Sequence, residues 1–223
     1  MPPFSRLPTS RANPRPAAPS LTAAQSTSAD RGAPLMAATA DLPLPIEPLS
    51  PVAFAPYGVM LGRPYDATAP APAFTNVNTD FWHQHVFETG SGGRTEVLWV
   101  NYRRCDGRID TLEVHHLTQQ AIVPLGSTGV VHVVARSDAQ GAPDLGTLRA
   151  FDIAPGQGVC MQPGCWHATQ VETGEATCLM LTRDSTTVEL VAHMQHGAPA
   201  DESALQRLPH AYLLGRRADQ LGR

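Results

Sequence analysis

Short apolar runs, broken at regular intervals by turn-forming residues, constrain the fold of this chain more than any other feature. The clearest run is EVLWVNY at residues 96–102, and Gly, Pro, Asp or Asn separates many of the runs that follow it. Those later runs cover residues 111–116, 120–124, 129–136, 148–153, 158–161, 168–172 and 178–182. Regularly spaced short strands are typical of all-β barrels and sandwiches. The sequence lacks the alternating long helical patterns of a doubly wound α/β fold.

The pattern divides the chain into three parts. Residues 1–40 are rich in Pro, Ala, Ser and Arg, a composition that buries little apolar surface, so we expect a disordered tail. Residues 41–200 hold the β domain, with further strands expected at 46–49, 59–61 and 81–87. Residues 201–223 are expected to form a helical tail. Short helices are predicted at residues 50–56, 201–208 and 211–220.

Composition excludes several classes of partner. The 223 residues carry a formal net charge of −4, so no basic field is available to hold nucleic acid or an anionic membrane surface. No apolar run approaches the ~20 residues of a membrane-spanning helix. The four cysteines, at positions 105, 160, 165 and 178, match no zinc-ribbon spacing. We expect them to be free thiols in a reducing compartment.

The N-terminus does not contain the apolar core of a secretory signal. Its Arg- and Ser-bearing, acid-poor composition fits a transit peptide, and it also fits a start assigned too far upstream, because Met36 stands just before the patterned region. We favour a dispensable tail on a cytoplasmic protein.

Two stretches that are distant in sequence supply polar side chains suited to one site. In LEVHHLTQQAIVP (112–124), Glu113 and His115 lie two apart, so both point to the same side of a strand, and Gln120 returns on the next strand. His167 ends GQGVCMQPGCWH (156–167). These donors suit a hard or borderline divalent metal, or they bind a small polar substrate by hydrogen bonds and a general base. An outward-facing pair on a solvated strand is the simpler alternative.

This spacing resembles the cupin superfamily. A typical cupin has a His-x-His pair, a Glu after four residues, and a later Pro-Gly-x-x-His. Here Glu113 takes the first His place, His115 the second and Gln120 the Glu place, and residues 163–167 match the last motif. The resemblance implies an all-β, double-stranded β-helix (jelly-roll) barrel with short peripheral helices.

One branch is more similar still, the ureidoglycolate lyase family. Five stretches carry the resemblance in order: PLSPVAFAPYG (48–58), LEVHHLTQQAIVPL (112–125), PDLGTLRAF (143–151), GQGVCMQPGCWH (156–167) and LTRDS (181–185). Four positions depart from that family's usual residues. Gln162 and Ala168 stand in place of His, Thr182 in place of Asp, and His116 in place of Pro. These departures lie in or beside the expected site.

The resemblance implies cleavage of ureidoglycolate, a carbinolamine acid, to glyoxylate and urea in allantoin and purine nitrogen catabolism. A base must take the hydroxyl proton and an acid must protonate the departing nitrogen. The available groups are His115, His167, Glu113 and His83, although His83 also fits a surface position on an alternating strand. A divalent metal (Zn, Mn, Ni or Fe) would be held by Glu113, His115, Gln120 and His167, and no organic cofactor is expected.

An arginine is expected to neutralise the substrate carboxylate, and the candidates are Arg103, Arg149 and Arg183. Gln120, Gln162 and Trp166 are further candidate substrate contacts, although Trp166 also suits packing of its own turn. His132, within VVHVVA, fits a structural role.

Two other functions remain open at this point. One is a different cupin enzyme, a metal-dependent oxygenase or isomerase, because Glu113, His115 and His167 form a two-His, one-carboxylate set. The other is a non-catalytic sensor of a small acid. In every case the expected partner is a small carboxylic acid, with neither nucleic acid nor membrane, and the family resemblance implies a homodimer.

Overall fold

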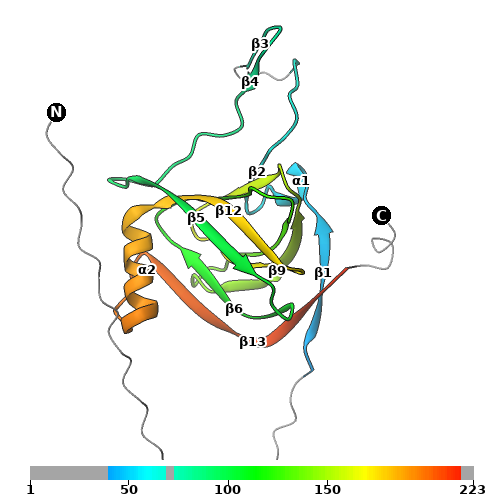
Figure 1. The fold of residues 1–223 in the computed structure, drawn as a ribbon. Helices are drawn as coiled ribbons and strands as arrows, with labels where there is room; N and C mark the ends of the chain where they lie inside the picture. The colour runs from blue at the N-terminus through cyan, green and yellow to red at the C-terminus, as the bar shows by residue number, and fades with distance from the viewer. Residues whose placement is uncertain (1–39, 69–72, 217–223) are drawn as a thin grey trace, which may run out of the picture. The chain divides into compact units, whose positions relative to one another are not determined.

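The computed structural model describes residues 40–68 and 73–216 as a strand-rich domain (Figure 1). Its elements are β1 (Leu42–Pro48), α1 (Pro51–Phe54), β2 (Gly58–Leu61), β3 (Ala73–Thr75), β4 (Asp80–Trp82), β5 (Thr95–Arg103), β6 (Arg108–His115), β7 (Gln120–Pro124), β8 (Val130–Ser137), β9 (Pro143–Ile153), β10 (Gly158–Met161), β11 (Trp166–Gln170), β12 (Glu175–Arg183), α2 (Asp184–His196) and β13 (Ser203–Arg216). Within these ranges no helix is long and apolar enough to cross a membrane.

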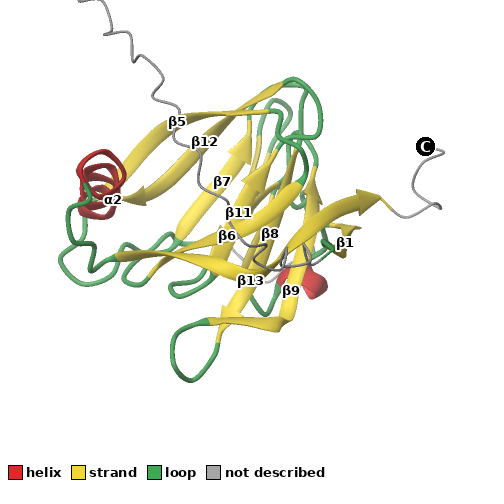
Figure 2. Ribbon diagram, turned by 90° about the horizontal axis from the view of Figure 1, so that it is seen from below, coloured by secondary structure: helices red, strands yellow, loops and turns green. Residues whose placement is uncertain are grey.

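Most of the strands belong to two large sheets (Figure 2). Six strands close into a ring in the order β1-β13-β6-β11-β8-β9, and five more form an open sheet in the order β2-β10-β7-β12-β5. The small β3-β4 hairpin stands apart from both. The all-β, cupin-type barrel with short peripheral helices is therefore confirmed.

Alternation along the strands produces two apolar cores. One, the inter-sheet core, gathers around Ile122, Phe151 and Met161 from the two sheets and Phe54 from α1. The other, the ring core, fills the six-stranded ring around Ile46, Leu112, Val133, Trp166 and Leu208. Strands β6, β8 and β11 have one face in the ring core and the opposite face toward the open sheet, so their polar residues can only be accommodated on the second face.

The C-terminal helices predicted at 201–208 and 211–220 are wrong for the described residues. Residues 203–216 form β13, which pairs antiparallel with β6 and parallel with β1. Leu208 is buried in the ring core, so its burial and the two ladders override the helix propensity of the Leu, Ala, Gln and Arg residues around it. The β domain predicted to end at residue 200 therefore continues to Arg216.

Helix α2 is a second difference, because the sequence pattern predicts no helix at 184–196. Asp184 lies in its first turn, and Gly197 ends it in the left-handed conformation with φ 67°. Both are ordinary helix boundary signals. The apolar side chains Val188, Val191 and Met194 are exposed, so they do not form the clean buried stripe that periodicity detects.

The N-terminal elements are close to prediction, with one exception. The expected helix at 50–56 is α1, whose first turn is capped by Ser50 accepting from the Ala53 N–H at 3.2 Å. The expected strand at 81–87 is limited to β4, and residues 83–90 have no regular structure. The predicted tail at 1–40 lies almost entirely outside the described residues.

Candidate active site

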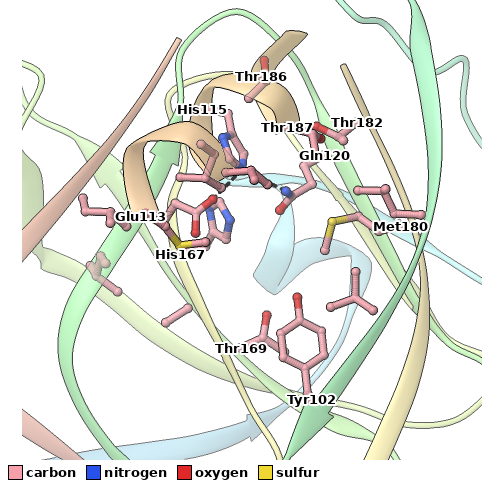
Figure 3. Close-up of a pocket in the computed structure, with 18 of the residues that line it drawn as sticks. Tyr102, Glu113, His115, Gln120, His167, Thr169, Met180, Thr182, Thr186 and Thr187 are labelled. Carbon is pink, nitrogen blue, oxygen red and sulfur yellow. Dashed lines mark hydrogen bonds and ion pairs between the residues drawn. The ribbon is translucent and has the colours of Figure 1, made fainter. Parts of the chain in front are cut away.

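A cavity of about 580 Å³ opens between the two sheets, beside α2. Its walls come from β5 and β12 on one side and from β6 and β11 on the other, with Gln120 of β7, Leu205 of β13 and one side of α2 completing it. Figure 3 shows Glu113, His115, His167 and Gln120 gathered at one end of this cavity.

Strand alternation places the acidic and imidazole groups. Leu112 and Val114 of β6 are buried in the ring core, so Glu113 and His115 point the other way, into the cavity. His167 of β11 lies directly opposite Glu113 in the antiparallel pairing of the two strands. Residues fifty positions apart in the chain are therefore neighbours, as the two sequence stretches predicted.

Both imidazoles are oriented by a contact at Nδ1. His115 Nδ1 lies 3.1 Å from Ser203 Oγ, and His167 Nδ1 lies 3.1 Å from the carbonyl oxygen of Cys165. The carbonyl can only accept, so His167 carries its proton on Nδ1 and directs an Nε2 lone pair away from it. The two rings are 5.2 Å apart between centroids.

Two groups compete for the remaining nitrogen of His115. Its Nε2 lies 2.9 Å from a Glu113 carboxylate oxygen and 2.8 Å from Gln120 Nε2. One nitrogen cannot both donate to a carboxylate and accept from an amide N–H. A cation among these groups would resolve the conflict, with the Gln120 amide turned over so that its oxygen faces inward.

The donor set fits such a cation. Glu113, His115 and His167 each offer one ligand atom, and these atoms all lie within 4.8 Å of one another. Two imidazole nitrogens and one carboxylate, with Gln120 next to them, suit a borderline divalent metal that keeps an open position for substrate.

The protonation states at neutral pH follow from the surroundings. Burial alone raises the pKa of Glu113, but the hydrogen bond from His115 and the neighbouring imidazoles outweigh it and lower that pKa, so the carboxylate is ionised. Burial lowers the pKa of His167 to about 4, so its ring is neutral. Both groups therefore have free electron pairs at pH 7.

A polar pair lies in the cavity across from this cluster. Tyr102 of β5 and Thr169 of β11 are neighbours in Figure 3. Burial raises the pKa of Tyr102 to about 12, so its hydroxyl stays protonated and can donate. Behind them, the buried His132 contacts Thr169 Oγ1 at 3.0 Å through Nδ1 and Met161 Sδ at 3.0 Å through Nε2.

Thr182 is the most unusual polar residue of the cavity wall. Its side chain is buried, and its Oγ1 has no hydrogen-bond partner among the described residues. Buried hydroxyls are normally paired, so this oxygen is suited to a ligand or water in the cavity. The sequence marked this position only as a departure from the family pattern.

The three predicted arginines do not line the cavity. Arg149 forms an ion pair with Glu47 and stacks near Phe151, and Arg103 forms an ion pair with Glu175. Arg183 contacts Glu202 and the backbone of the 89–91 turn. The expected guanidinium for the substrate carboxylate therefore has no support in this geometry, since each arginine is engaged with an acidic partner elsewhere.

Three further predicted residues also lie outside the cavity lining. His83 is exposed, Gln162 donates to the carbonyl oxygen of Pro56, and Trp166 is buried in the ring core with Nε1 donating to Gly141. The structure thus brings together Glu113, His115, Gln120 and His167, and the other three residues lie elsewhere.

Some residues of the cavity lining were not predicted from the sequence. They are Tyr102, Thr169, Met180 and the side chains of α2. For Tyr102 a signal was available, because the alternation of β5 turns Leu98, Val100 and Tyr102 inward.

Comparison with known proteins gives one consistent family. The family model described as ureidoglycolate lyase matches residues 41–197. A ureidoglycolate lyase of Rhodobacter capsulatus is 32% identical over 135 residues, covering 59% of this chain and 80% of that protein. Ureidoglycolate lyase 2 of Rhizobium meliloti is 35% identical over 131 residues, covering 56% of this chain and 76% of that protein.

Solved structures were also compared. RmlC from Streptococcus suis, in complex with dTDP-D-xylose, has a TM-score of 0.36 at 12% identity, covering 50% of this chain and 60% of that one. An oxalate decarboxylase of Bacillus subtilis has a TM-score of 0.30 at 12% identity, covering 60% of this chain and 43% of that one. Scores this low support no inference about the cavity.

Proposed function

We propose that this chain, which belongs to the ureidoglycolate lyase family, cleaves ureidoglycolate to glyoxylate and urea. The observation that carries the proposal is the convergence of Glu113, His115 and His167 in one cavity of a family member. Family membership favours the lyase over the oxygenase and the sensor that the same residues would allow.

The reaction needs one proton to move from oxygen to nitrogen. Ureidoglycolate has a hydroxyl, a carboxylate and a urea nitrogen on one carbon. Glu113, ionised and facing the cavity, takes the hydroxyl proton, and the carbon–nitrogen bond breaks as the carbonyl of glyoxylate forms. The same carboxyl group then returns the proton to the departing nitrogen, so urea leaves neutral and no other reactant is consumed.

The surrounding residues orient the substrate and hold charge. His167 is neutral at pH 7 and presents Nε2, while Tyr102 and Thr182 offer hydroxyl groups to its polar atoms. A divalent metal held by His115, His167 and one carboxylate oxygen of Glu113, with Gln120 beside them, would supply the positive charge that the substrate carboxylate and the developing alkoxide require. The second oxygen of Glu113 would remain free to take the hydroxyl proton.

The activity is tested by incubating the purified protein with ureidoglycolate and measuring glyoxylate and urea separately. A lyase releases the two in equal amounts, whereas hydrolysis of the urea group would release ammonia instead. Glu113→Gln should lower kcat by at least ~100-fold because it removes the base. Full activity of this variant would contradict the proposed role.

Metal binding is tested on the protein as purified. We expect elemental analysis to find a divalent metal, and His115→Ala and His167→Ala to lose it. His116→Ala is the matched control, because its side chain is exposed and lies next to His115 in the chain. Equal metal content in all three variants would contradict the ligand assignment.

We also propose that the protein is a homodimer in solution. Support comes from the outer face of the open sheet, where Val97 and Trp99 of β5 are 56% and 66% exposed beside Leu179 and Leu181 of β12. This patch is apolar and carries no charged side chain at these four positions. An uncharged face can pair with a copy of itself without desolvating like charges.

A further inference from the structure

The cavity is divided into a polar end and an apolar wall. The polar end holds Glu113, His115, Gln120 and His167, whereas Figure 3 shows Met180 on the side across from Glu113 and His167. The apolar wall consists of Leu98, Val100, Met180, Leu190, Val191 and Met194. Three of these residues come from the open sheet and three from α2.

The apolar side chains of this wall form no hydrogen bonds with ureidoglycolate. That substrate carries polar atoms on all sides, and its urea group gains no free energy from contact with hydrocarbon. The cavity volume of about 580 Å³ also lies in the range of pockets that enclose drug-sized ligands. A small polar acid held at Glu113 and His115 can reach the hydroxyl groups of the cavity but would leave the apolar wall in contact with water.

The charge of the lining points in the same direction. Of the residues described around the cavity, none is a lysine or an arginine, and Glu113 is the one acidic residue. A second charged group on the ligand therefore has no oppositely charged partner in this lining. Helix α2 contributes the hydroxyl groups of Thr186 and Thr187, and its other lining side chains, Leu190, Val191 and Met194, are apolar. An apolar group there would gain from leaving water.

We infer that the preferred substrates are carbinolamine acids with an apolar substituent beyond the amide, R–CO–NH–CH(OH)–COO⁻ with R a short alkyl chain. The inference rests on the proposed lyase activity and names its substrate class. The hydroxy acid end binds at Glu113, His115 and His167, and R lies between β5, β12 and α2.

The chemistry of the cleaved bond is unchanged. The hydroxyl loses its proton, the carbon–nitrogen bond breaks with its electron pair staying on nitrogen, and nitrogen takes the proton. The products are glyoxylate and the primary amide R–CO–NH₂, and neither an oxidant nor a reductant is needed.

Binding is tested first, with analogues that cannot react because they lack the hydroxyl. Calorimetry on the purified protein compares N-hexanoylglycine with N-carbamoylglycine. We expect the hexanoyl compound to bind at least about tenfold more tightly, since its alkyl chain is buried against the wall. Equal affinities, or tighter binding of the carbamoyl compound, would overturn the inference.

Turnover is tested next, by the ratio of kcat/KM for N-hexanoyl-2-hydroxyglycine to that for ureidoglycolate. We expect this ratio to exceed about ten in the unmodified protein and to fall at least about tenfold in Val191→Glu and Met194→Glu, which place a charge on the wall. Val188→Glu is the matched control on the same helix, since Val188 is 70% exposed and does not line the cavity. We expect it to leave the ratio unchanged.

The outcomes separate this inference from the proposed function. Cleavage of ureidoglycolate with slower cleavage of the hexanoyl substrate overturns the substrate class alone. Tight binding of N-hexanoylglycine without cleavage of either substrate overturns the lyase activity and supports the apolar subsite. A ratio that falls equally in Val188→Glu would show that the wall does not determine it and would also overturn the inference.

Discussion

At the scale of single residues, the site combines imidazoles that have hydrogen-bond partners with one buried hydroxyl group that has none among the described residues. The imidazoles of His115 and His167 are each anchored at Nδ1, by Ser203 and by the Cys165 carbonyl. Thr182 Oγ1, by contrast, is buried and has no hydrogen-bond partner in the part of the chain that the structure describes. A protein retains an unpaired buried hydroxyl at a cost in stability, and such positions are concentrated where a ligand completes the pairing.

The substitution Thr182→Val tests this reading, because valine has nearly the same shape without the hydroxyl. We expect the free energy of unfolding to rise by about 1 kcal/mol, since an unsatisfied polar group is removed. We expect kcat/KM for ureidoglycolate to fall at least ~10-fold. Denaturant unfolding and the glyoxylate assay measure the two effects. Thr177→Val, on the outer face of the same strand, is the control, and a parallel loss of activity there would argue against a specific role for Thr182.

The buried histidines predict how stability depends on pH. Burial lowers the pKa of His132 well below 6.5 and that of His167 to about 4, so in the folded state both rings stay neutral where an unfolded chain would already bind protons. The contribution of these two neutral rings to the free energy of unfolding is therefore fully present above about pH 6.5. It decreases as the pH falls below that value, by about 1.4 kcal/mol per pH unit for each ring. Urea unfolding of the metal-free protein between pH 7 and pH 5 measures this slope. A free energy of unfolding that stays constant over this range would contradict the burial of these rings.

The thiols give a third prediction about single residues. Burial raises the pKa of Cys160 and of Cys165 to about 12, and that of Cys178 to about 11, whereas Cys105 is exposed. Because the thiolate is the reactive form, iodoacetamide at pH 8 should label one cysteine rapidly. Mass spectrometry should place the label on Cys105 and find none in Cys105→Ser. Rapid labelling of a second cysteine would contradict the packing around it.

At the scale of elements, the sequence predicted what depends on local alternation and missed what depends on long-range pairing. Glu113 and His115 were assigned to one side of a strand because Leu112 and Val114 alternate with them, and the structure has this arrangement. Strand β13 could not be predicted in this way. Its strand state is imposed by ladders to β1 and β6, whose partners lie up to about 170 positions away in the chain.

The same distinction explains the arginines. A guanidinium flanked by apolar residues suggests a buried charge that needs an acid, but sequence does not identify the acid. The structure supplies Glu47 of β1 for Arg149 of β9, and Glu202, just before β13, for Arg183 at the end of β12. The sequence therefore made Arg149 a candidate for the substrate carboxylate without distinguishing a structural acidic partner from a substrate.

The corrected assignment of β13 leads to a prediction about stability. Leu208 is 6% exposed and belongs to the ring core, so Leu208→Ala should lower the free energy of unfolding by about 2–5 kcal/mol. Leu213→Ala is the control on the same strand, because Leu213 is 48% exposed and should cost much less. Thermal or urea denaturation measures both. Equal small effects would instead fit a peripheral segment that contributes little to the core.

At the scale of the whole molecule, the described chain closes into a ring that supports the site. Strand β1 pairs in parallel with β13 and with β9, so the first and last described strands complete the six-stranded ring. The ring core stabilises β6 and β11 from behind, and these two strands carry Glu113, His115 and His167. The cavity thus lies on a rigid sheet on one side, while α2 supplies its more exposed edge.

The outer face of the open sheet is expected to form the dimer interface. Trp99 and Val97 are exposed on β5, which is an edge strand, and an apolar face of this kind next to an open edge favours association. We expect light scattering after size-exclusion chromatography to give twice the mass of the chain, and Trp99→Glu to give a monomer, because each copy would then bury a charge opposite an apolar surface. Val188→Glu, on α2, should remain a dimer. Circular dichroism distinguishes dissociation from unfolding, and a folded Trp99→Glu protein of unchanged mass would assign this face no part in assembly.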